Sequence, residues 1–323
     1  MSRHMPAVVP PTRSGVGPSC VGLPAGHWDT VFDFLVQRFP AQSAATWRMR
    51  MDQGLVRDEQ GQAVAAAQAY RGHQRIYYYR DCPVETPIPF QAEVLYRDDD
   101  LLVVDKPHFL PVTPSGRYLQ ETVLVRLKRE LGLDDIVPIH RIDRDTAGLV
   151  MFSLRPASRD AYHALFRSRR IEKTYEAVAP WRSDLLLPLT RTSRIVQGAH
   201  FLQQCEGTGE PNAMTHIALL RSMGSLAHYR LQPVTGHRHQ LRVHMAALGM
   251  AIAGDGIYPV LTPQRETVTD LPLQLLARSI RFTDPLGGKA REFESRRTLA
   301  LADAGSMHMG QAADGADQRD SAQ

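Results

Sequence analysis

The order of the apolar segments is the feature that most restricts the fold of this chain. From Val94 onward, short apolar stretches typical of β-strands follow one another, and only a few segments with helical spacing lie between them. A doubly wound parallel sheet would require strands and helices to alternate along the chain. The sequence therefore predicts an α+β fold, in which helices flank a mixed and mostly antiparallel central sheet.

Changes in composition divide the 323 residues into five parts. Residues 1–26 are rich in Pro, Gly and Ser, and residues 301–323 are poor in bulky apolar side chains, so both are predicted to be disordered. Residues 27–82 contain two short helical patterns and a basic strand with three tyrosines, which predicts a small α/β domain. A proline-rich linker at residues 83–92 leads to a larger domain at residues 93–300.

The start of the small domain carries clear local signals for a helix. Apolar side chains recur at helical spacing over residues 31–39, and Pro40 ends the pattern. Either Asp29 or Thr30 is placed to cap the first turn. A second short helix is expected before Gly54.

Composition argues against several classes of protein. Cys20, Cys82 and Cys205 lie far apart, so they form neither a disulfide framework nor a zinc motif. No stretch reaches the roughly 20 apolar residues that a membrane-spanning helix needs. The net charge of +4 permits a polyanionic partner. We expect a cytoplasmic protein that binds no metal and no membrane.

A densely charged stretch of the chain lies directly before a predicted buried strand. The segment HRIDRDTAGLVMFS places Asp143 between Arg141 and Arg144. These arginines favour the ionised carboxylate despite partial burial, and a carboxylate on a loop that leads into a rigid strand suits a nucleophile or a general base. A solvated loop of surface ion pairs would have the same pattern.

A second segment combines a cation with an aromatic ring. In EKTYEAV, Lys173 and Tyr175 are two residues apart on a predicted strand, so they share one face. A ring that stacks on a base beside a cation that meets a phosphate suits a nucleotide pocket. An exposed lysine beside a core tyrosine is the alternative interpretation.

A third segment, TGHRHQLRVHMAALG, contains three histidines and two arginines. The histidine spacings match no zinc-binding helix, and an anion site near the start of a helix fits better. The glycine-flanked Asp255 in AGDGIYP is interpreted as part of a structural turn. Because the chain has no glycine-rich nucleotide motif, the residues indicate chemistry by one carboxylate, without a cofactor, on an anionic substrate.

Together these segments resemble the RluA-type family of RNA pseudouridine synthases. The resemblance runs from about Val94 to Pro285 and includes DDDLLVVDKP, HRIDRDTAGL (similar to H-R-[LI]-D-x-x-T-[SA]-G-L), EKTYEAV, and TGHRHQLRVH followed by GDGIYP. Residues 27–82 are more weakly similar to the ribosomal-protein S-four-like RNA-binding domain. The chain departs from the family at His237, where an arginine is usual, and at Leu276, where a histidine is usual.

The resemblance implies an isomerase that converts specific uridines in structured ribosomal RNA, transfer RNA or both to pseudouridine. It implies that Asp143 attacks a flipped-out uridine, that Tyr175 stacks on the uracil, and that Arg242 pairs with the aspartate. The remaining candidate residues would contact the RNA: Arg141, which could also fill the vacated stack, His140, Lys173, Arg144, Lys106 and His239. No cofactor or metal is implied, and we expect a monomer.

Two other functions share part of this pattern. A nucleosidase or glycosidase that uses Asp143 would release free uracil, but glycosidases usually need a second carboxylate, and only Asp145 or Asp255 is at hand. An RNA-binding or ribosome-assembly factor with a vestigial site would bind RNA without isomerising it.

Overall fold

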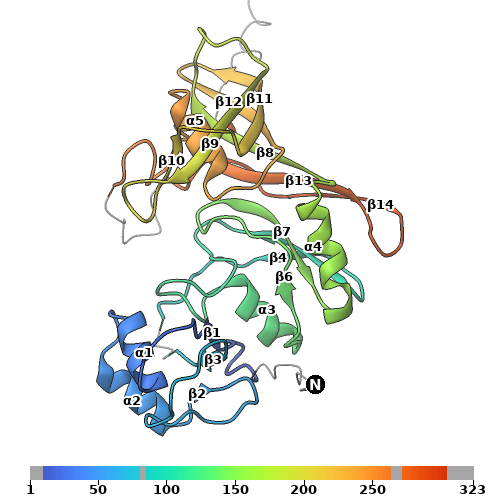
Figure 1. The fold of residues 1–323 in the computed structure, drawn as a ribbon. Coiled ribbons are helices and arrows are strands. Elements are labelled where there is room, and N and C mark those ends of the chain that lie inside the picture. The colour runs from blue at the N-terminus through green and yellow to red at the C-terminus, as the bar shows by residue number, and fades with distance from the viewer. Residues whose placement is uncertain (1–9, 81–84, 263–270, 304–323) are drawn as a thin grey trace, which may run out of the picture. The chain divides into compact units, whose positions relative to one another are not determined.

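The computed structural model describes residues 10–80, 85–262 and 271–303, which divide into two compact units (Figure 1). The smaller unit comprises Met1–Thr86, Gly116–Gln120 and Val125–Asp134, and the larger unit comprises Pro87–Ser115, Glu121–Leu124 and Asp135–Gln323. The division after Thr86 falls inside the range predicted for the linker. The sequence prediction puts residues 116–120 and 125–134 in the larger domain, whereas the structure groups them with the smaller unit. Contacts in space, and not position in the chain, decide which unit a segment joins.

In residues 10–80, which belong to the smaller unit, the structure describes two helices and a three-stranded antiparallel sheet. The sheet order is β1 (Ser19–Gly22), β3 (Arg75–Tyr78), β2 (Val56–Arg57), and the helices are α1 (Val31–Arg38) and α2 (Ala44–Asp52). Thr30 caps α1, since its hydroxyl accepts from the Asp33 N–H while the Asp33 carboxylate accepts from the Thr30 N–H. This confirms one of the two caps predicted from the sequence.

The structure corrects both predicted disordered ends where it describes them. Ser19–Gly22 forms β1, and the neighbouring Leu23 is buried in the core of the smaller unit with Trp47 and Ile76. The composition of this segment, rich in Pro, Gly and Ser, predicts disorder, but the hydrogen bonds of β1 to β3 hold it in a strand. At the other end Ala302 is buried, whereas residues 304–323 of the predicted tail, like Cys82, lie outside the described residues.

One large sheet organises the larger unit, in the order β10-β9-β11-β12-β8-β13-β7-β5-β4, with β14 on β13 and β6 on β7. The pairing of β13 with β7 is parallel and the other described pairings are antiparallel, which confirms the predicted fold class. The strands are β4 (Glu93–Arg97), β5 (Leu101–Lys106), β6 (Val137–Pro138), β7 (Ala147–Ser153), β8 (Ile171–Pro180), β9 (Leu189–Gln197), β10 (Gln204–Gly207), β11 (Ala213–Met223), β12 (Leu226–Pro233), β13 (Leu275–Thr283) and β14 (Ala290–Glu294).

Helices cover parts of this sheet through their apolar faces. Helix α4 (Arg159–Arg167) buries Tyr162 and Leu165 against β5, β7 and β13, and α5 (Gln240–Ala247) buries Leu241 and Met245 against β8, β11 and β12 (Figure 1). Helix α3 (Val123–Leu131) crosses the division between the units. In the described parts of the chain, every helix is too short or too polar to cross a bilayer.

Gly148 allows the two halves of the large sheet to meet. It has a φ of +109°, and a Cβ atom at this position would lie 2.3 Å from the carbonyl oxygen of Ala277 on β13. Ala277 is in register with Gly148 on β7 and with Tyr175 on β8. The close β7–β13 contact therefore carries the loop that precedes β7 toward the strand that carries Tyr175.

Candidate active site

The carboxylate of Asp143 is paired with a buried guanidinium. The Arg242 Nη1 donates to Asp143 Oδ2 at 3.0 Å, although the two residues are 99 positions apart in the chain. The side chain of Arg242 is 2% exposed and that of Asp143 is 29% exposed. The arrangement holds an anionic oxygen at the edge of solvent while its counter-ion stays inside the protein, as the sequence prediction for this pair requires.

Asp255 completes the setting of Arg242, and the sequence interpretation missed this role. Its carboxylate accepts from Arg242 Nε at 2.8 Å and from Nη2 at 2.6 Å, and also from the backbone N–H groups of Ile257 and Tyr258. This two-pronged contact fixes the plane of the guanidinium and so directs Nη1 toward Asp143. The turn prediction was right, and the signal overlooked was a carboxylate 13 residues after a buried arginine.

Neither nearby acid is free to serve as the second carboxylate of a glycosidase. The Asp255 side chain is fully buried, and both of its oxygens are engaged. Asp145 is paired with Arg144, whose Nε donates to it at 2.8 Å. The geometry therefore counts against the nucleosidase or glycosidase alternative, and Arg144 is at least partly committed to an ion pair.

His239 lies between Asp143 and Tyr258. It is the N-cap of α5 with a left-handed backbone (φ +56°), its Nε2 is 3.8 Å from Asp143 Oδ1, and its Nδ1 is 3.1 Å from the Tyr258 hydroxyl. Burial lowers the pKa of His239, while the negative charge of Asp143 raises it. This places His239 at the predicted site, in contact with site residues.

Tyr175 projects from β8 and is half-buried. Burial, together with the negative charge of Asp143, raises the pKa of its hydroxyl, so the phenol is neutral at physiological pH and within electrostatic reach of the carboxylate. Its ring packs against the core beneath α5. The structure thus brings Asp143, Tyr175 and Arg242 together from three different elements.

Lys106 has a different role from the RNA contact predicted for it. Its side chain is completely buried, and its Nζ donates to the backbone carbonyls of Pro107 and Arg144 at 2.9 Å each. Burial lowers the pKa of Lys106 to about 7, although the charges of Asp145 and Asp143 oppose this. A side chain without solvent exposure cannot reach a phosphate, so Lys106 instead holds the loop that carries Asp143.

His140 also serves the framework in this structure. Its Nε2 accepts a hydrogen bond from the Met151 N–H at 3.1 Å, and its ring stacks on Phe166 with centroids 4.8 Å apart. Burial and the charge of Lys173 lower the pKa of His140 to about 3. The ring is therefore neutral, which argues against the predicted contact with phosphate through charge.

A small cavity of about 190 Å³ is lined by Phe166, the ring on which His140 stacks, and by basic side chains. Lys173, Arg169 and His237 line it together with Phe166 and Gly236. The Nζ of Lys173 donates to the carbonyl of Thr235 at 3.3 Å, and burial lowers its pKa. Lys173 therefore lines a concave site, and its contact with RNA stays a prediction.

The other predicted residues and the two family departures are also located. Arg141 is exposed beside Asp143. His237 is exposed, and its Nε2 lies 2.8 Å from the carbonyl of Asn212. Leu276 is fully buried against Ala147, so that departure affects packing. Within the described residues no cluster of three or more His, Cys, Asp or Glu side chains is arranged to hold a metal ion.

Comparisons with known proteins place this site in a family. Residues 100–247 match the model for RNA pseudouridylate synthases. A dual-specificity RNA pseudouridine synthase RluA from Escherichia coli O6:H1 is 32% identical over 211 residues, which cover 62% of this chain and 91% of that protein. The chain belongs to the RNA pseudouridylate synthase family. It is of the RluA type, as the motifs predict, and it is an isomerase that forms pseudouridine in RNA.

Other members of the family match a smaller part of their own length or match only in fold. The mitochondrial tRNA pseudouridine(32) synthase of Saccharomyces cerevisiae is 30% identical over 184 residues, which cover 56% of this chain and 39% of that protein. The solved structure of human RNA pseudouridylate synthase domain containing 1 shares the fold, with a TM-score of 0.54 and 22% identity over 71% of this chain and 97% of that one.

Proposed function

We propose that this pseudouridine synthase modifies specific uridines in structured ribosomal RNA, transfer RNA or both, with Asp143 as the nucleophile on a flipped-out uridine. The observation that carries the proposal is the partly exposed Asp143 carboxylate held at 3.0 Å by the buried Arg242. The guanidinium donates to Oδ2 and so holds the carboxylate in one orientation for nucleophilic attack. Asp255 orients the guanidinium, so the carboxylate needs little rearrangement before it attacks.

The base must leave its stack before a carboxylate can reach the glycosidic bond. Unstacking costs a few kcal/mol, and stacking on an aromatic ring offsets about 1–3 kcal/mol per base. Tyr175 offers such a ring, and the neutral phenol creates no charge repulsion with the uracil carbonyls. Arg141 is exposed and close to Asp143 in the chain, and we propose that its guanidinium fills the space that the base vacates.

Cations around the small cavity suit the backbone of the same RNA. Lys173 and Arg169 present positive charge to a concave site, and phosphate contacts of this kind position an RNA without reading its sequence. The exposed His237 takes the place of the usual arginine, so this edge of the cavity presents an imidazole instead of a guanidinium. We expect the phosphate next to the target uridine to bind here.

The names of the relatives support the proposed substrate class. One is named for dual specificity on RNA and another for a transfer RNA position. The smaller unit, which includes residues 27–80, presents Arg71 and Arg75 on its surface, so we propose that it contributes to RNA binding. Mapping of pseudouridines in RNA from cells with and without the protein identifies the target.

The test of the catalytic assignment is Asp143→Asn. The amide keeps the size of the carboxylate but is a far weaker nucleophile, so pseudouridine formation should be lost while RNA binding stays within about threefold of the parent. Single-turnover isomerisation and filter binding measure the two quantities on the same RNA. Full activity in this variant would contradict the role of Asp143, and free uracil as product would support a nucleosidase instead.

A further inference from the structure

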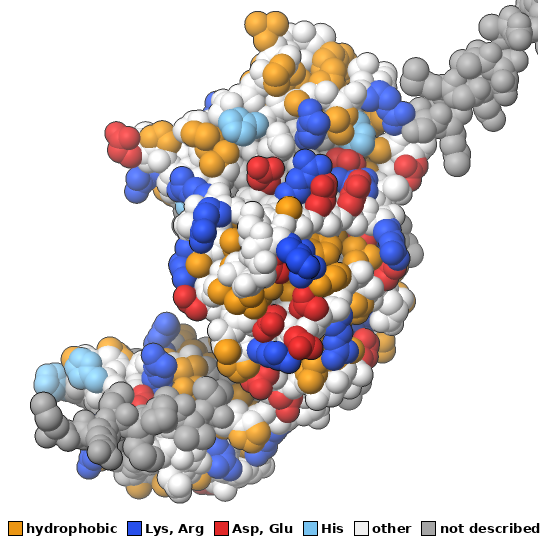
Figure 2. All heavy atoms as spheres, turned by 90° about the vertical axis from the view of Figure 1, so that its right-hand side faces the viewer, with side chains coloured by type: hydrophobic (Ala, Val, Ile, Leu, Met, Phe, Trp, Pro, Cys, Tyr) orange, Lys and Arg blue, Asp and Glu red, His pale blue; other side chains and the backbone are white. Residues whose placement is uncertain are grey.

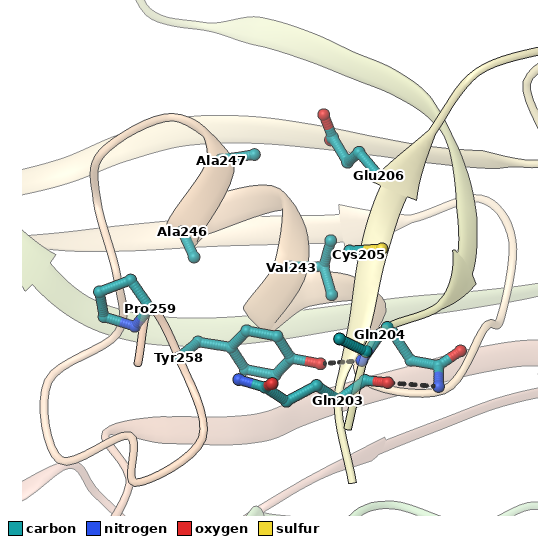
Figure 3. Close-up of a pocket in the computed structure, with 11 residues that line it drawn as sticks. Gln203, Gln204, Cys205, Glu206, Val243, Ala246, Ala247, Tyr258 and Pro259 are labelled. Carbon is teal, nitrogen blue, oxygen red and sulfur yellow. Dashed lines mark hydrogen bonds between the residues drawn. The ribbon is translucent and has the colours of Figure 1, made fainter. Parts of the chain in front are cut away.

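A second and larger cavity, of about 370 Å³, lies between strand β10 and helix α5 (Figure 3). Val243, Ala246 and Ala247 form its helix side, and Gln204 and Glu206 form part of its strand side. The Tyr258 ring lies between the two sides in Figure 3. Neither the sequence motifs nor the proposed mechanism gives this cavity a function.

The shape and lining of the cavity suit a flat, mostly apolar ring. Its helix side carries only the small side chains of one valine and two alanines, and Pro259 and Tyr258 add further apolar surface. Ligand sites of this kind combine apolar walls with a few polar groups that fix orientation. The polar groups here are on the strand.

Strand β10 lies at the edge of the large sheet, so one side of its backbone has no neighbouring strand among the described residues. The Gln204 N–H donates to the Tyr258 hydroxyl at 2.7 Å, which shows that the backbone of Gln204 points away from β9 and toward the cavity. Backbone groups alternate in direction along an antiparallel strand. The N–H and carbonyl of Glu206 therefore point the same way as those of Gln204.

The cavity-facing edge thus presents, in order, the Gln204 carbonyl, the Glu206 N–H and the Glu206 carbonyl. This acceptor–donor–acceptor order matches an adenine edge, where the exocyclic amino group donates, N1 accepts and the C2–H is a weak donor. Uracil presents an acceptor, a donor and an acceptor on its corresponding edge. In this cavity its acceptors would face the strand's carbonyls and its donor would face the Glu206 N–H, so it would not bind. The Glu206 carboxylate, held by Arg191, also favours a ligand with an amino group.

The cavity is linked to the catalytic carboxylate by a short chain of contacts. Tyr258 meets β10 on one side and His239 on the other, and His239 lies 3.8 Å from Asp143. Arg238 donates to the carbonyl of Phe201 at 3.0 Å and so ties the β9–β10 hairpin to the start of α5. A base in this cavity would therefore be held at a fixed position relative to the target uridine.

We propose that the cavity between β10 and α5 binds an adenine of the substrate RNA, extruded close to the target uridine, and reads its amino edge with the backbone of β10. The inference rests on the proposed function, because it assigns one specificity determinant to the same RNA. Such a cavity would make the enzyme select RNA that has an unpaired adenine near the target uridine.

Ligand-observed NMR titration of the full chain with AMP and IMP tests the cavity directly. The two nucleotides have the same shape, but IMP carries an acceptor and an N1–H donor where AMP has a donor and an acceptor. We expect AMP to bind at least about fivefold more tightly, as the loss of one or two hydrogen bonds predicts. Equal affinities would overturn the proposal.

Matched variants separate the cavity from the rest of the protein. Glu206→Pro removes the backbone N–H of residue 206, which lies on the side of β10 that faces away from β9. Glu206→Ala removes the same carboxylate but keeps this N–H. AMP should bind about fivefold more weakly to the proline variant than to the alanine variant. Ala247→Trp should block the cavity, with Ala247→Ser as its control. If both Glu206→Pro and Ala247→Trp bind AMP as tightly as their controls do, the proposal is overturned.

Activity assays connect the cavity to the RNA. On the mapped substrate, Ala247→Trp should raise KM at least about fivefold relative to Ala247→Ser, with kcat retained, and an unchanged KM would overturn the assignment. AMP binding does not depend on Asp143. An active Asp143→Asn enzyme with normal AMP binding would therefore contradict only the catalytic proposal, and an inactive one without AMP selectivity would contradict only this inference.

Discussion

Arg242 is the residue whose surroundings explain most about the site. A buried guanidinium is costly unless its charge is paired and its donors are used, and here two carboxylates supply both. Burial alone would lower the pKa of Arg242, but Asp255 and Asp143 raise it above its ordinary value. The cation is therefore permanent, and one of its two partners is left accessible for chemistry.

Replacing Arg242 by lysine should reveal how much the orientation of the carboxylate matters. A lysine keeps the charge but cannot hold Asp255 with two donors while a third reaches Asp143. We expect Arg242→Lys to lower the single-turnover rate by about 10²-fold, which corresponds to about 3 kcal/mol of transition-state stabilisation. A rate within threefold of the parent, in a variant that unfolds normally in urea, would show that charge alone suffices.

Lys106 gives a prediction about stability and pH. Its pKa is about 7 in the folded protein and near its ordinary value of 10.5 when unfolded. Between these values the unfolded chain binds one more proton, so this residue makes stability rise with pH from about 7 to 10.5. Lys106→Met should remove that rise in urea-unfolding free energies measured at several pH values, whereas the exposed Lys289→Met should keep it.

At the scale of elements, the parallel contact between β7 and β13 is what assembles the site. Ala277 on β13 is in register with Gly148 at the start of β7 and with Tyr175 on β8. The Asp143 loop enters β7 directly, and Lys106 at the end of β5 holds the carbonyl of Arg144. The separation between Asp143 and Tyr175 is thus set by strand spacing and by one glycine.

Gly148→Ala tests this contact against a matched glycine. An added Cβ would lie 2.3 Å from the Ala277 carbonyl oxygen, so β7 must move, whereas Gly224 also has a positive φ, of +66°, but open space around its Cβ position. We expect Gly224→Ala to cost about 1 kcal/mol in unfolding free energy. Gly148→Ala should cost at least about 2 kcal/mol more and should lower kcat; equal costs would show that the strands adjust freely.

For the whole molecule, the distribution of charge matters more than its sum. The net charge is the small difference between 38 basic and 34 acidic residues. On the face of the larger unit shown in Figure 2, which carries α4 and β14, cationic and anionic side chains are interspersed. Arg281 on β13 pairs with Glu292 on β14. RNA affinity is therefore expected to depend on particular exposed arginines rather than on overall charge.

The contribution of the smaller unit can be measured by salt dependence. Each arginine that meets a phosphate releases counter-ions, so Arg71→Ala and Arg75→Ala should each reduce the slope of log K against log salt by about 1 and weaken binding. The turnover number at saturating RNA should not change. Arg281→Ala is the control, and slopes that match this control would contradict RNA binding by the smaller unit.

Local sequence patterns determined the elements and the identity of the reactive groups. The Thr30 cap, the α1 periodicity and the buried β7 are set by neighbours a few residues apart, and such spacing is visible in the sequence. The resemblance of the four motifs to the RluA-type family singled out Asp143, Tyr175 and Arg242. The sequence alone therefore predicted the fold class and the family, and the catalytic roles of these three residues stay a prediction.

Only the tertiary structure decided how these groups act on one another. The Asp143–Arg242 pair joins residues 99 positions apart. Asp255 orients the guanidinium of Arg242, and Lys106 is buried where it holds the loop that carries Asp143. Register also decided which backbone groups of β10 face the second cavity. The physical reason is that burial and long-range hydrogen bonds depend on which strands become neighbours, and the spacing of residues along one segment does not contain that information.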